Sequence, residues 1–287
     1  MTCLILGYSG QVASHLREQL PGALCWGRDT LDLCDTASIE RSIHAVTPTS
    51  LVNAAAYTAV DKAETEREAA WAINTTAVAA MARAAKSLDI PLIHISTDYV
   101  FDGTKSEPYR TDDTTGPINT YGRSKLGGEL AVATLCPKHW ILRTSWVFSE
   151  HGSNFVKTML RLAADRTELS IVADQLGVPT YAGDIATVIA ALVERGTTTG
   201  VPWGIHHTVG GPAVTWHAFA QAIFSSAQNR GMLRHAVKAN AISTADYPTP
   251  AGRPANSVLE TSHEMLESLG VDLDWQVGLE RMLGQSS

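Results

Sequence analysis

Short apolar segments alternate with longer segments of helical periodicity through the first two thirds of the chain. We expect strands over 2–6, 23–26, 51–54, 92–96 and 140–143, and helices over 11–20, 38–46, 64–88 and 120–135. Asp61 and Glu64 have the spacing of a capping box at the start of the longest of these helices. This alternation predicts a parallel sheet with helices on both faces.

After about residue 150 the pattern becomes less regular. It predicts helices over 154–165, 184–195 and 215–229, the last capped by Thr215, and strands over 169–172 and 205–209. The proline-rich segment 247–254 should form a stiff loop that can hold a side chain over a pocket. We therefore predict an α/β protein. Its Rossmann-type doubly wound parallel sheet should occupy residues 1–150, with later segments returning to it, and a smaller C-terminal substrate-binding lobe should occupy mainly residues 151–287.

Composition narrows the class of protein. The 287 residues are 45% hydrophobic, which is enough for a full core, and the net charge of −7 argues against a nucleic-acid partner. The four cysteines form no CxxC pair and are expected to be reduced thiols. The apolar run at the N-terminus is too short for a signal peptide, and no segment reaches membrane-spanning length. We expect a cytoplasmic protein with no membrane partner.

A glycine motif, Gly7-x-x-Gly10, follows the first predicted strand and opens the first predicted helix. The helix N-terminus offers unpaired amides and a partial positive charge, which suit a pyrophosphate. Gly10 would let the cofactor approach the backbone closely, and Ala13 would allow tight packing of the helix on the sheet. The motif lacks one glycine of the fuller dinucleotide fingerprint, so a plain tight turn is the alternative.

The ends of the second and third strands bear on the choice of cofactor. Arg28 follows the second strand and would favour NADPH through a charge-assisted contact with the 2′-phosphate, unless it is only a solvated surface arginine. Asp32, followed by Leu33, could approach the adenine edge. The small side chains of segment 54–56 would let the cofactor touch the backbone after the third strand, or they simply pack well there.

A tyrosine and a lysine, Tyr121 and Lys125, lie four residues apart on one face of a predicted helix. A phenol with a pKa of about 10 is a poor acid–base group at neutral pH. We expect the Lys125 ammonium to lower the pKa of Tyr121 and to hold the nicotinamide ribose. Thr97, at the end of the fourth strand, would donate a hydrogen bond to the substrate carbonyl. Asp98 and Tyr99 would either contact the substrate or cap a turn.

The ten histidines show no HxxxH, HxH or HExxH spacing. We expect His206 and His207 to lie on a strand at the surface. The sequence therefore predicts no metal site.

These motifs resemble the extended short-chain dehydrogenase/reductase superfamily and, within it, the dTDP-4-dehydrorhamnose reductases. The resemblance extends over nearly the whole chain, and several of its strings are uncommon. They are the motifs at 7–12, 52–64, 96–101, 117–129, 142–147, 177–180 and 247–257.

The resemblance implies an oxidoreductase of dTDP-rhamnose biosynthesis that uses NADPH, with NADH possible. It would reduce the C4 ketone of the sugar nucleotide dTDP-4-dehydro-L-rhamnose. By motif position Tyr121 would donate the proton, Lys125 would support it and bind cofactor, and Trp146 would pack on the sugar. Thr97 and Asp98 would contact that sugar. The positions that match cofactor contacts are Gln11, Val12, Asp32, Ala56, Tyr57 and Thr58. Independently, the guanidinium of Arg253 suits a diphosphate.

One position departs from the resemblance. Some members carry a glutamate early in the first helix that helps to bind Mg²⁺ at a dimer interface, and this chain has His15 there. Imidazole is a poor ligand for an ion that prefers oxygen, so Mg²⁺ is not expected and we predict a monomer or a metal-free homodimer. Two alternatives remain for the function. One is a related sugar-nucleotide epimerase or dehydratase that retains NAD, and the other is a non-catalytic NADP-binding regulatory subunit.

Overall fold

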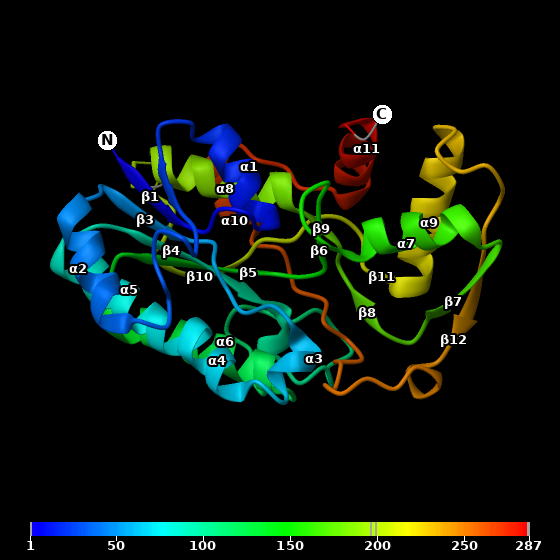
Figure 1. Ribbon diagram of the computed structural model, residues 1–287, viewed down its shortest axis with the longest axis horizontal. Helices are drawn as coiled ribbons and strands as arrows, with labels where there is room; N and C mark the ends of the chain where they lie inside the picture. Colours follow the sequence, from blue (N-terminus) through cyan, green and yellow to red (C-terminus); the bar gives the residue numbers. More distant parts are fainter. Residues whose placement is uncertain (1, 196, 199, 286–287) are drawn as a thin grey trace.

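The computed structural model describes residues 2–195, 197–198 and 200–285, and it folds into two lobes (Figure 1). In the larger lobe, six described strands form one sheet in the order β10-β5-β4-β3-β1-β2, with every neighbouring pair parallel. The strands are β1 (Cys3–Leu6), β2 (Leu24–Trp26), β3 (Ser50–Asn53), β4 (Leu92–Thr97), β5 (His139–Thr144) and β10 (Gly204–His207). The predicted parallel sheet is confirmed.

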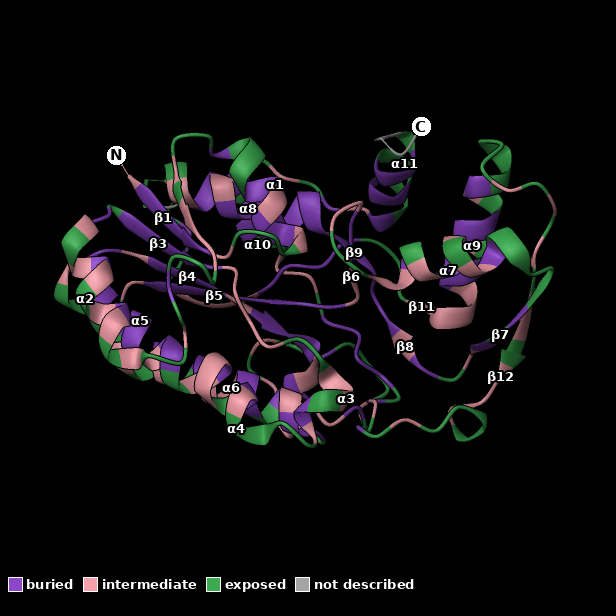
Figure 2. Cartoon of the chain, in the orientation of Figure 1, coloured by how far each residue is buried: buried purple, intermediate pink, exposed green. Residues whose placement is uncertain are grey.

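Helices cover both faces of this sheet. One layer contains α1 (Gln11–Gln19), α8 (Ala182–Arg195) and α10 (His263–Leu269), and the other contains α2 (Thr36–Val46), α5 (Ala77–Ser87) and α6 (Thr120–Leu135). Alternate strand residues serve the two layers: Ile5 packs with the first and Leu4 with the second. Because both faces of the central strands β1, β3, β4 and β5 are covered, these strands are buried along almost their whole length, which is why the sequence showed short apolar runs instead of alternation. Figure 2 shows the buried sheet between its helices.

The long helix predicted over roughly 64–88 is confirmed over residues 67–87, but it starts later than predicted and its winding changes along its length. The structure has α3 (Val60–Ala63), α4 (Arg67–Trp71), a π-helical turn η1 (Ala72–Thr76) and then α5. The widened turn presents Asn74, whose side chain bonds the backbone of Tyr57 and the hydroxyl of Ser124. Alanine-rich composition favours a helix here, but these tertiary bonds accompany a local change of its winding.

The capping box predicted from Asp61 and Glu64 is wrong. Asp61 lies inside α3 and pairs with Arg253 at 3.0 Å. Glu64 accepts hydrogen bonds from the backbone N–H and the hydroxyl of Thr120, at the start of α6. Both carboxylates therefore join distant segments and do not cap a local helix.

The smaller lobe has its own apolar core, in which Phe148, Phe219 and Trp275 are buried. The strands β7 (Glu168–Val172) and β12 (Lys238–Ile242) pair in parallel, and α7 (Phe155–Asp165), α9 (Trp216–Asn229) and α11 (Trp275–Gln285) pack with them. Thr215 caps α9, as predicted. Shorter elements are β6 (Val147–Phe148), β8 (Leu176–Gly177), β9 (Thr180–Tyr181), β11 (Val214–Thr215), η2 (Asp98–Val100) and η3 (Thr244–Asp246).

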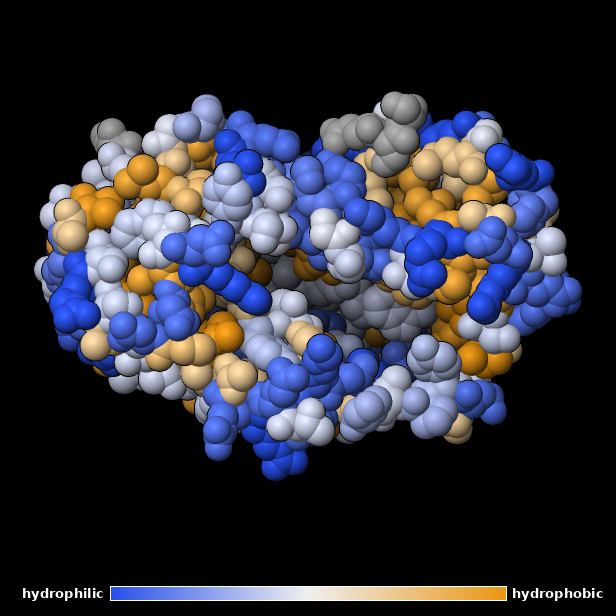
Figure 3. Space-filling model, viewed as in Figure 1, coloured by the Kyte–Doolittle hydropathy of each residue, from blue (hydrophilic) through white to orange (hydrophobic). Residues whose placement is uncertain are grey.

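Segments beyond residue 150 return to the main sheet. Strand β10 pairs with β5 at the edge, and α8 and α10 cover that region. His207 on β10 is fully buried, so its predicted surface position is wrong; its Nδ1 lies 3.1 Å from the carbonyl of Glu260. Figure 3 shows a hollow between the two lobes on one face of the molecule. Among the described helices, none is both long and apolar enough to cross a membrane.

Candidate active site

The carboxyl ends of the parallel strands lie together at one edge of the sheet. Strand β1 has β2 on one side and β3 on the other, so the chain reverses its direction of winding there. Ligands of such sheets bind in the crevice outside this point. Thr97 ends β4 and Thr144 ends β5 at the same edge.

The glycine motif has the geometry of a close backbone approach. Gly7 has φ of +134°, and a Cβ built there would lie 3.1 Å from the carbonyl carbon of Ala54. A Cβ on Gly10, the N-cap of α1, would meet no atom within 4 Å. In the described structure no side chain caps the first turn of α1, which also lacks acidic residues. These amides fit a pyrophosphate, and buried Ala13 packs against Gly7 as expected.

The remaining residues of the predicted cofactor site surround this loop. The Gln11 amide bonds Asn154 and lies 3.4 Å from the Val147 carbonyl, while Val12 is buried. Arg28 is exposed on the turn after β2. The carboxylate of Asp32 accepts a hydrogen bond from the backbone N–H of Cys34, next to half-buried Leu33.

A second cation near the loop was not singled out from the sequence. The guanidinium of Arg17 lies 4.1 Å above the ring of Tyr8 and donates a hydrogen bond to the Tyr8 carbonyl. The Tyr8 side chain in turn approaches Gly27, the residue before Arg28. Arg17 thus belongs to the surroundings of the glycine loop, although a helical arginine carries no sequence signal of this role.

The loop after β3 is held by hydrogen bonds to its backbone. Asn53 accepts from the N–H of Ala55, and Asn74 bonds both backbone groups of Tyr57. The Tyr57 hydroxyl donates to Glu66 at 2.7 Å. Along this loop Ala56 and Tyr57 are half-buried, and Thr58 is exposed.

The predicted catalytic side chains meet at the end of β4. The Thr97 hydroxyl bonds Tyr121 and donates to Asp98 Oδ1 at 2.9 Å. It also accepts the backbone N–H of Tyr99 at 3.2 Å, and the rings of Tyr99 and Tyr121 meet edge to face at 5.8 Å. The Lys125 Nζ donates to the Ile95 carbonyl at 2.7 Å, two residues before Thr97.

Electrostatics at Tyr121 differ from the expectation. Burial raises the pKa of Tyr121 above its ordinary value, and the hydrogen bond with Thr97 opposes this only in part. Burial also lowers the pKa of Lys125 to about 8, against the attraction of Glu129. The predicted lowering of the phenol pKa by Lys125 is therefore wrong for this arrangement of protein groups. A phenol that stays protonated at neutral pH suits a proton donor.

Asp98 is an unusual buried acid. Burial raises its pKa to about 6, while hydrogen bonds from Ser257 and Thr97 act in the opposite direction. Its Oδ2 has no hydrogen-bond partner among the described residues. A buried carboxylate with a raised pKa at a strand end is a common feature of functional sites. Ser257 lies in the motif at 247–257, but the sequence did not indicate its contact with Asp98.

A buried ion pair next to this site joins β5 to α6. Arg143 on β5 binds Glu129 on α6 at 2.8 Å, and each side chain is only 3% exposed. Ser96 donates to the same carboxylate, and Arg143 also bonds the Thr111 carbonyl at 3.3 Å. Because neither charge can be left alone in the interior, the pair holds the ends of β4 and β5 against the helix of Tyr121.

Trp146 faces the second lobe. It has φ of +45° after β5 and stacks on Trp216, with ring centroids 3.4 Å apart and planes within 7°. A Cβ on Gly177 would lie 2.4 Å from its indole. Trp216 was not predicted to belong to the site, because its place beside Trp146 depends on the packing of α9. Arg253 pairs with Asp61, so its proposed contact with a diphosphate stays a prediction.

The fold and these side chains define a dinucleotide-binding α/β protein of the short-chain dehydrogenase type. A family model described as RmlD substrate binding domain matches residues 1–287, and the chain belongs to this family. The chain is 45% identical to a dTDP-4-dehydrorhamnose reductase of Sinorhizobium fredii, over 99% of this chain and 97% of that protein. It is 41% identical to the reductase of that name from Escherichia coli K12, over 99% and 98% of the two chains.

Solved structures agree. A crystal structure of dTDP-4-dehydrorhamnose reductase from Bacillus anthracis in complex with NADP superposes with a TM-score of 0.90, at 35% identity and 99% coverage of each chain. The predicted fold class and the predicted resemblance are therefore confirmed.

Proposed function

We propose that this chain is an NADPH-dependent oxidoreductase that reduces the C4 ketone of dTDP-4-dehydro-L-rhamnose to dTDP-L-rhamnose, the last step of dTDP-rhamnose biosynthesis. The observation that carries the proposal is the meeting of Thr97, Tyr121 and Lys125 at the carboxyl end of β4. The names of full-length relatives and the NADP complex of a structural neighbour support it.

The residues that would hold NADPH surround the crevice at β1. The open side of Gly10 and the uncapped amides of α1 suit the pyrophosphate, and exposed Arg28 suits the 2′-phosphate. Lys125 would reach the ribose. The full set is Gly7, Gly10, Gln11, Val12, Arg28, Asp32, Leu33, Ala56, Tyr57, Thr58, Tyr121 and Lys125. When bound, NADPH supplies the hydride, and NADH can do the same.

The chain supplies the proton and the oxygen site. Tyr121 donates a hydrogen bond to the C4 carbonyl oxygen, and the Thr97 hydroxyl turns its single proton from Asp98 to the same oxygen, whose negative charge grows as the carbon is reduced. Tyr121 then transfers its phenolic proton to that oxygen, and the phenolate regains a proton from solvent. Before substrate binds, Asp98 accepts the hydrogen bond of the Thr97 hydroxyl and so holds this hydroxyl beside the carbonyl site. Lys125 would act by holding the nicotinamide ribose and not by lowering the pKa of the phenol.

The sugar nucleotide would lie between the two lobes. Asp98 and Tyr99 border the carbonyl site, and the stacked pair Trp146 and Trp216 offers an apolar wall for the sugar. Arg253 lies on the proline-rich loop and pairs with Asp61 in α3. The neighbouring Gly252 carbonyl accepts a hydrogen bond from Asn119, the N-cap of α6, so the loop is held beside the helix of Tyr121. In this assignment the segment 151–287 is mainly the substrate-binding lobe. Its strand β10 joins the cofactor-binding sheet, and its helices α8 and α10 pack on that sheet.

One assay tests the function. The purified chain is incubated with dTDP-4-dehydro-L-rhamnose and each reduced nicotinamide in turn, and the loss of reduced cofactor is followed with identification of the sugar product. We expect stoichiometric oxidation of NADPH and formation of dTDP-L-rhamnose. An epimerase or dehydratase would change the sugar without net oxidation of added NADPH. A regulatory subunit would bind NADP and turn nothing over.

We also propose that the chain is a monomer or a homodimer that no Mg²⁺ ion bridges. His15 replaces the carboxylate that the resemblance associates with a Mg²⁺-bridged dimer, and imidazole binds Mg²⁺ poorly. A sizing column run with Mg²⁺ and with EDTA should give the same elution volume. A dimer that dissociates on chelation would refute this state.

A further inference from the structure

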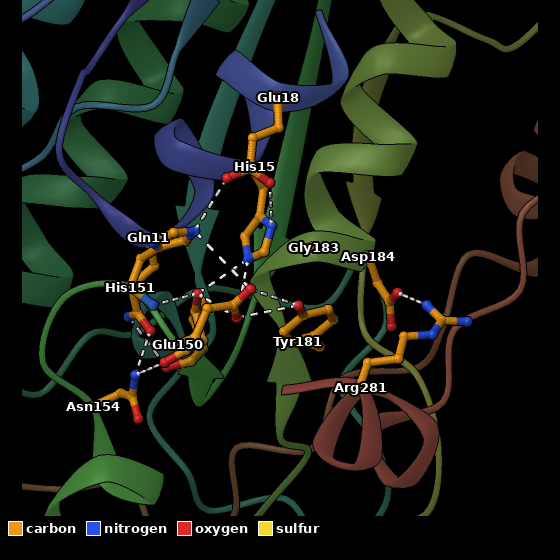
Figure 4. A network of polar contacts seen from close by, with 12 residues as sticks. Gln11, His15, Glu18, Glu150, His151, Asn154, Tyr181, Gly183, Asp184 and Arg281 are labelled. Atoms are coloured by element: carbon orange, nitrogen blue, oxygen red, sulfur yellow. Dashed lines mark hydrogen bonds and ion pairs between the residues drawn. The ribbon is translucent and has the colours of Figure 1, made fainter. Parts of the chain in front are cut away.

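A cluster of metal-ligating side chains lies outside the proposed catalytic site, between α1 and the loop that follows β6. Figure 4 shows the imidazoles of His15 and His151 converging on the carboxylate of Glu150. One ligand atom from each residue lies within 4.8 Å of the other two. His15 comes from α1 of the larger lobe, whereas Glu150 and His151 directly follow β6, whose Phe148 belongs to the core of the smaller lobe.

The nitrogen–oxygen distances between the two imidazoles and the Glu150 carboxylate are close to those between neighbouring ligand atoms of a metal ion. His15 Nε2 lies 3.5 Å from Glu150 Oε2, and His151 Nε2 lies 4.0 Å from Glu150 Oε1. Both exceed a good hydrogen bond between these atoms. Ligand atoms in a tetrahedral site with bonds of about 2.0–2.1 Å lie about 3.3 Å apart. A small inward movement of these side chains would therefore place all three on one ion.

The surroundings orient the three groups. The Tyr181 hydroxyl donates to both oxygens of Glu150, at 3.2 Å and 3.1 Å, and Ser149 lies 3.1 Å from His15 Nε2 and donates to Glu150 at 3.2 Å. The Glu18 carboxylate lies 3.9 Å from His15 Nδ1 and 3.5 Å from His151 Nε2. A carboxylate behind a ligating histidine raises its basicity and fixes its ring.

We propose that His15, Glu150 and His151 bind one divalent transition-metal ion of the Zn²⁺ class within a single chain. Two imidazoles and one carboxylate match the ligand preference of Zn²⁺, whereas Mg²⁺ prefers oxygen alone. His15 is buried, Glu150 is 16% exposed and His151 is 33% exposed, so the fourth position faces solvent. Glu18, which is largely exposed, stands next to that position.

The ion would act as a clamp. Gln11, one turn before His15 on α1, accepts a hydrogen bond from Asn154, the N-cap of α7. Helix α1 therefore already contacts the segment that follows residues 150–151, beside the glycine loop. A metal bond between α1 and residues 150–151 would fix the glycine loop relative to the second lobe. Because ligand binding to the folded state alone stabilises it, the ion should raise the thermal stability of the protein.

The test uses tag-free protein stripped with a chelator. Binding of Zn²⁺ is measured by competition with a chromophoric chelator, and Co²⁺ serves as a visible reporter of coordination. We expect one Zn²⁺ per chain, d–d bands of a four-coordinate Co²⁺ site, and a rise of a few degrees in the unfolding temperature with Zn²⁺. Excess Mg²⁺ should neither displace Zn²⁺ nor change that temperature.

Variants locate the site. His151→Asn should weaken Zn²⁺ binding at least about tenfold and remove the Co²⁺ bands, and its partial exposure makes a folding failure avoidable. His263→Asn alters an exposed histidine at the start of α10 and should bind Zn²⁺ like the parent. His15→Gln is a second ligand variant, with circular dichroism as the check on folding.

Three outcomes would overturn the proposal. They are equal Zn²⁺ affinity in the parent and in His151→Asn, a Co²⁺ spectrum that stays six-coordinate as in water, and a stoichiometry of one ion per two chains. The last outcome would place the ion between copies and not within one. Because none of these readouts involves turnover, their failure is separate from failure of the proposed reductase activity.

Discussion

The side-chain amide of Asn74 hydrogen-bonds both backbone groups of Tyr57. Its Oδ1 accepts the Tyr57 N–H at 2.8 Å, and its Nδ2 donates to the Tyr57 carbonyl at 3.0 Å. The same Nδ2 reaches the Ser124 hydroxyl at 2.9 Å, one residue before Lys125. A single side chain on the π turn thus joins the proposed cofactor loop to the helix of the proposed catalytic pair.

Asn74→Ala should weaken NADPH binding more than sugar binding. It removes a buried side chain and leaves two half-buried backbone groups of Tyr57 without this partner, which should lower the free energy of unfolding by about 1–3 kcal/mol. The KM for NADPH should rise, with a smaller change in the KM for the sugar nucleotide. Steady-state kinetics and urea unfolding measure these effects, and Asn229→Ala, at an exposed asparagine, is the control. Equal changes in both KM values would contradict the assignment.

Tyr121→Phe should reduce kcat by about two to four orders of magnitude, the usual range for loss of a positioned proton donor. The ring contact with Tyr99 is retained, so the site should keep its shape and its NADPH affinity. Stopped-flow turnover and a fluorescence titration with NADPH separate the two effects. Near-normal turnover in this variant would rule out Tyr121 as the donor.

Asp98→Asn should stabilise the protein at neutral pH and reduce its activity. The pKa of Asp98 is raised from 3.8 to about 6, so the folded protein holds this proton more tightly than the unfolded chain does. The ionised carboxylate therefore lowers stability above about pH 6, and this penalty disappears as pH falls to about 4. The gain in the variant should be at most about 3 kcal/mol at neutral pH.

Urea unfolding of both proteins at neutral pH and at about pH 4 measures this difference. The stability gain of Asp98→Asn should shrink over that interval, because the carboxyl of the parent becomes protonated. A gain that does not change with pH, or a loss at neutral pH, would show that the raised pKa is not what the substitution relieves.

Trp146→Ala should raise the KM for the sugar nucleotide and leave the KM for NADPH unchanged. The substitution removes a stacked pair with Trp216, and such pairs contribute about 0.5–1.5 kcal/mol beyond their burial. Gly177→Ala should act in the same direction, because its Cβ would displace the indole. Trp203→Ala, a half-exposed tryptophan that packs on Trp140 in the other lobe, is the matched control. A rise in both KM values would indicate general damage.

Several features followed from local sequence. Apolar runs predicted the central strands of the main sheet to within a residue or two, because a strand covered on both faces is apolar along most of its length. Gly7, Tyr121 and Lys125 were found because turn geometry and helical spacing depend on residues near one another in the chain. Thr97 was found because it ends a strand.

Other features were decided only by the tertiary structure. The π turn at Asn74, the pair of Asp61 with Arg253, and the stack of Trp146 on Trp216 each join residues far apart in the sequence. The cluster of His15 with residues 150–151 showed no spacing motif for the same reason. Burial, and not the neighbouring ammonium, set the direction of the pKa shift at Tyr121, since desolvation depends on everything packed around a group.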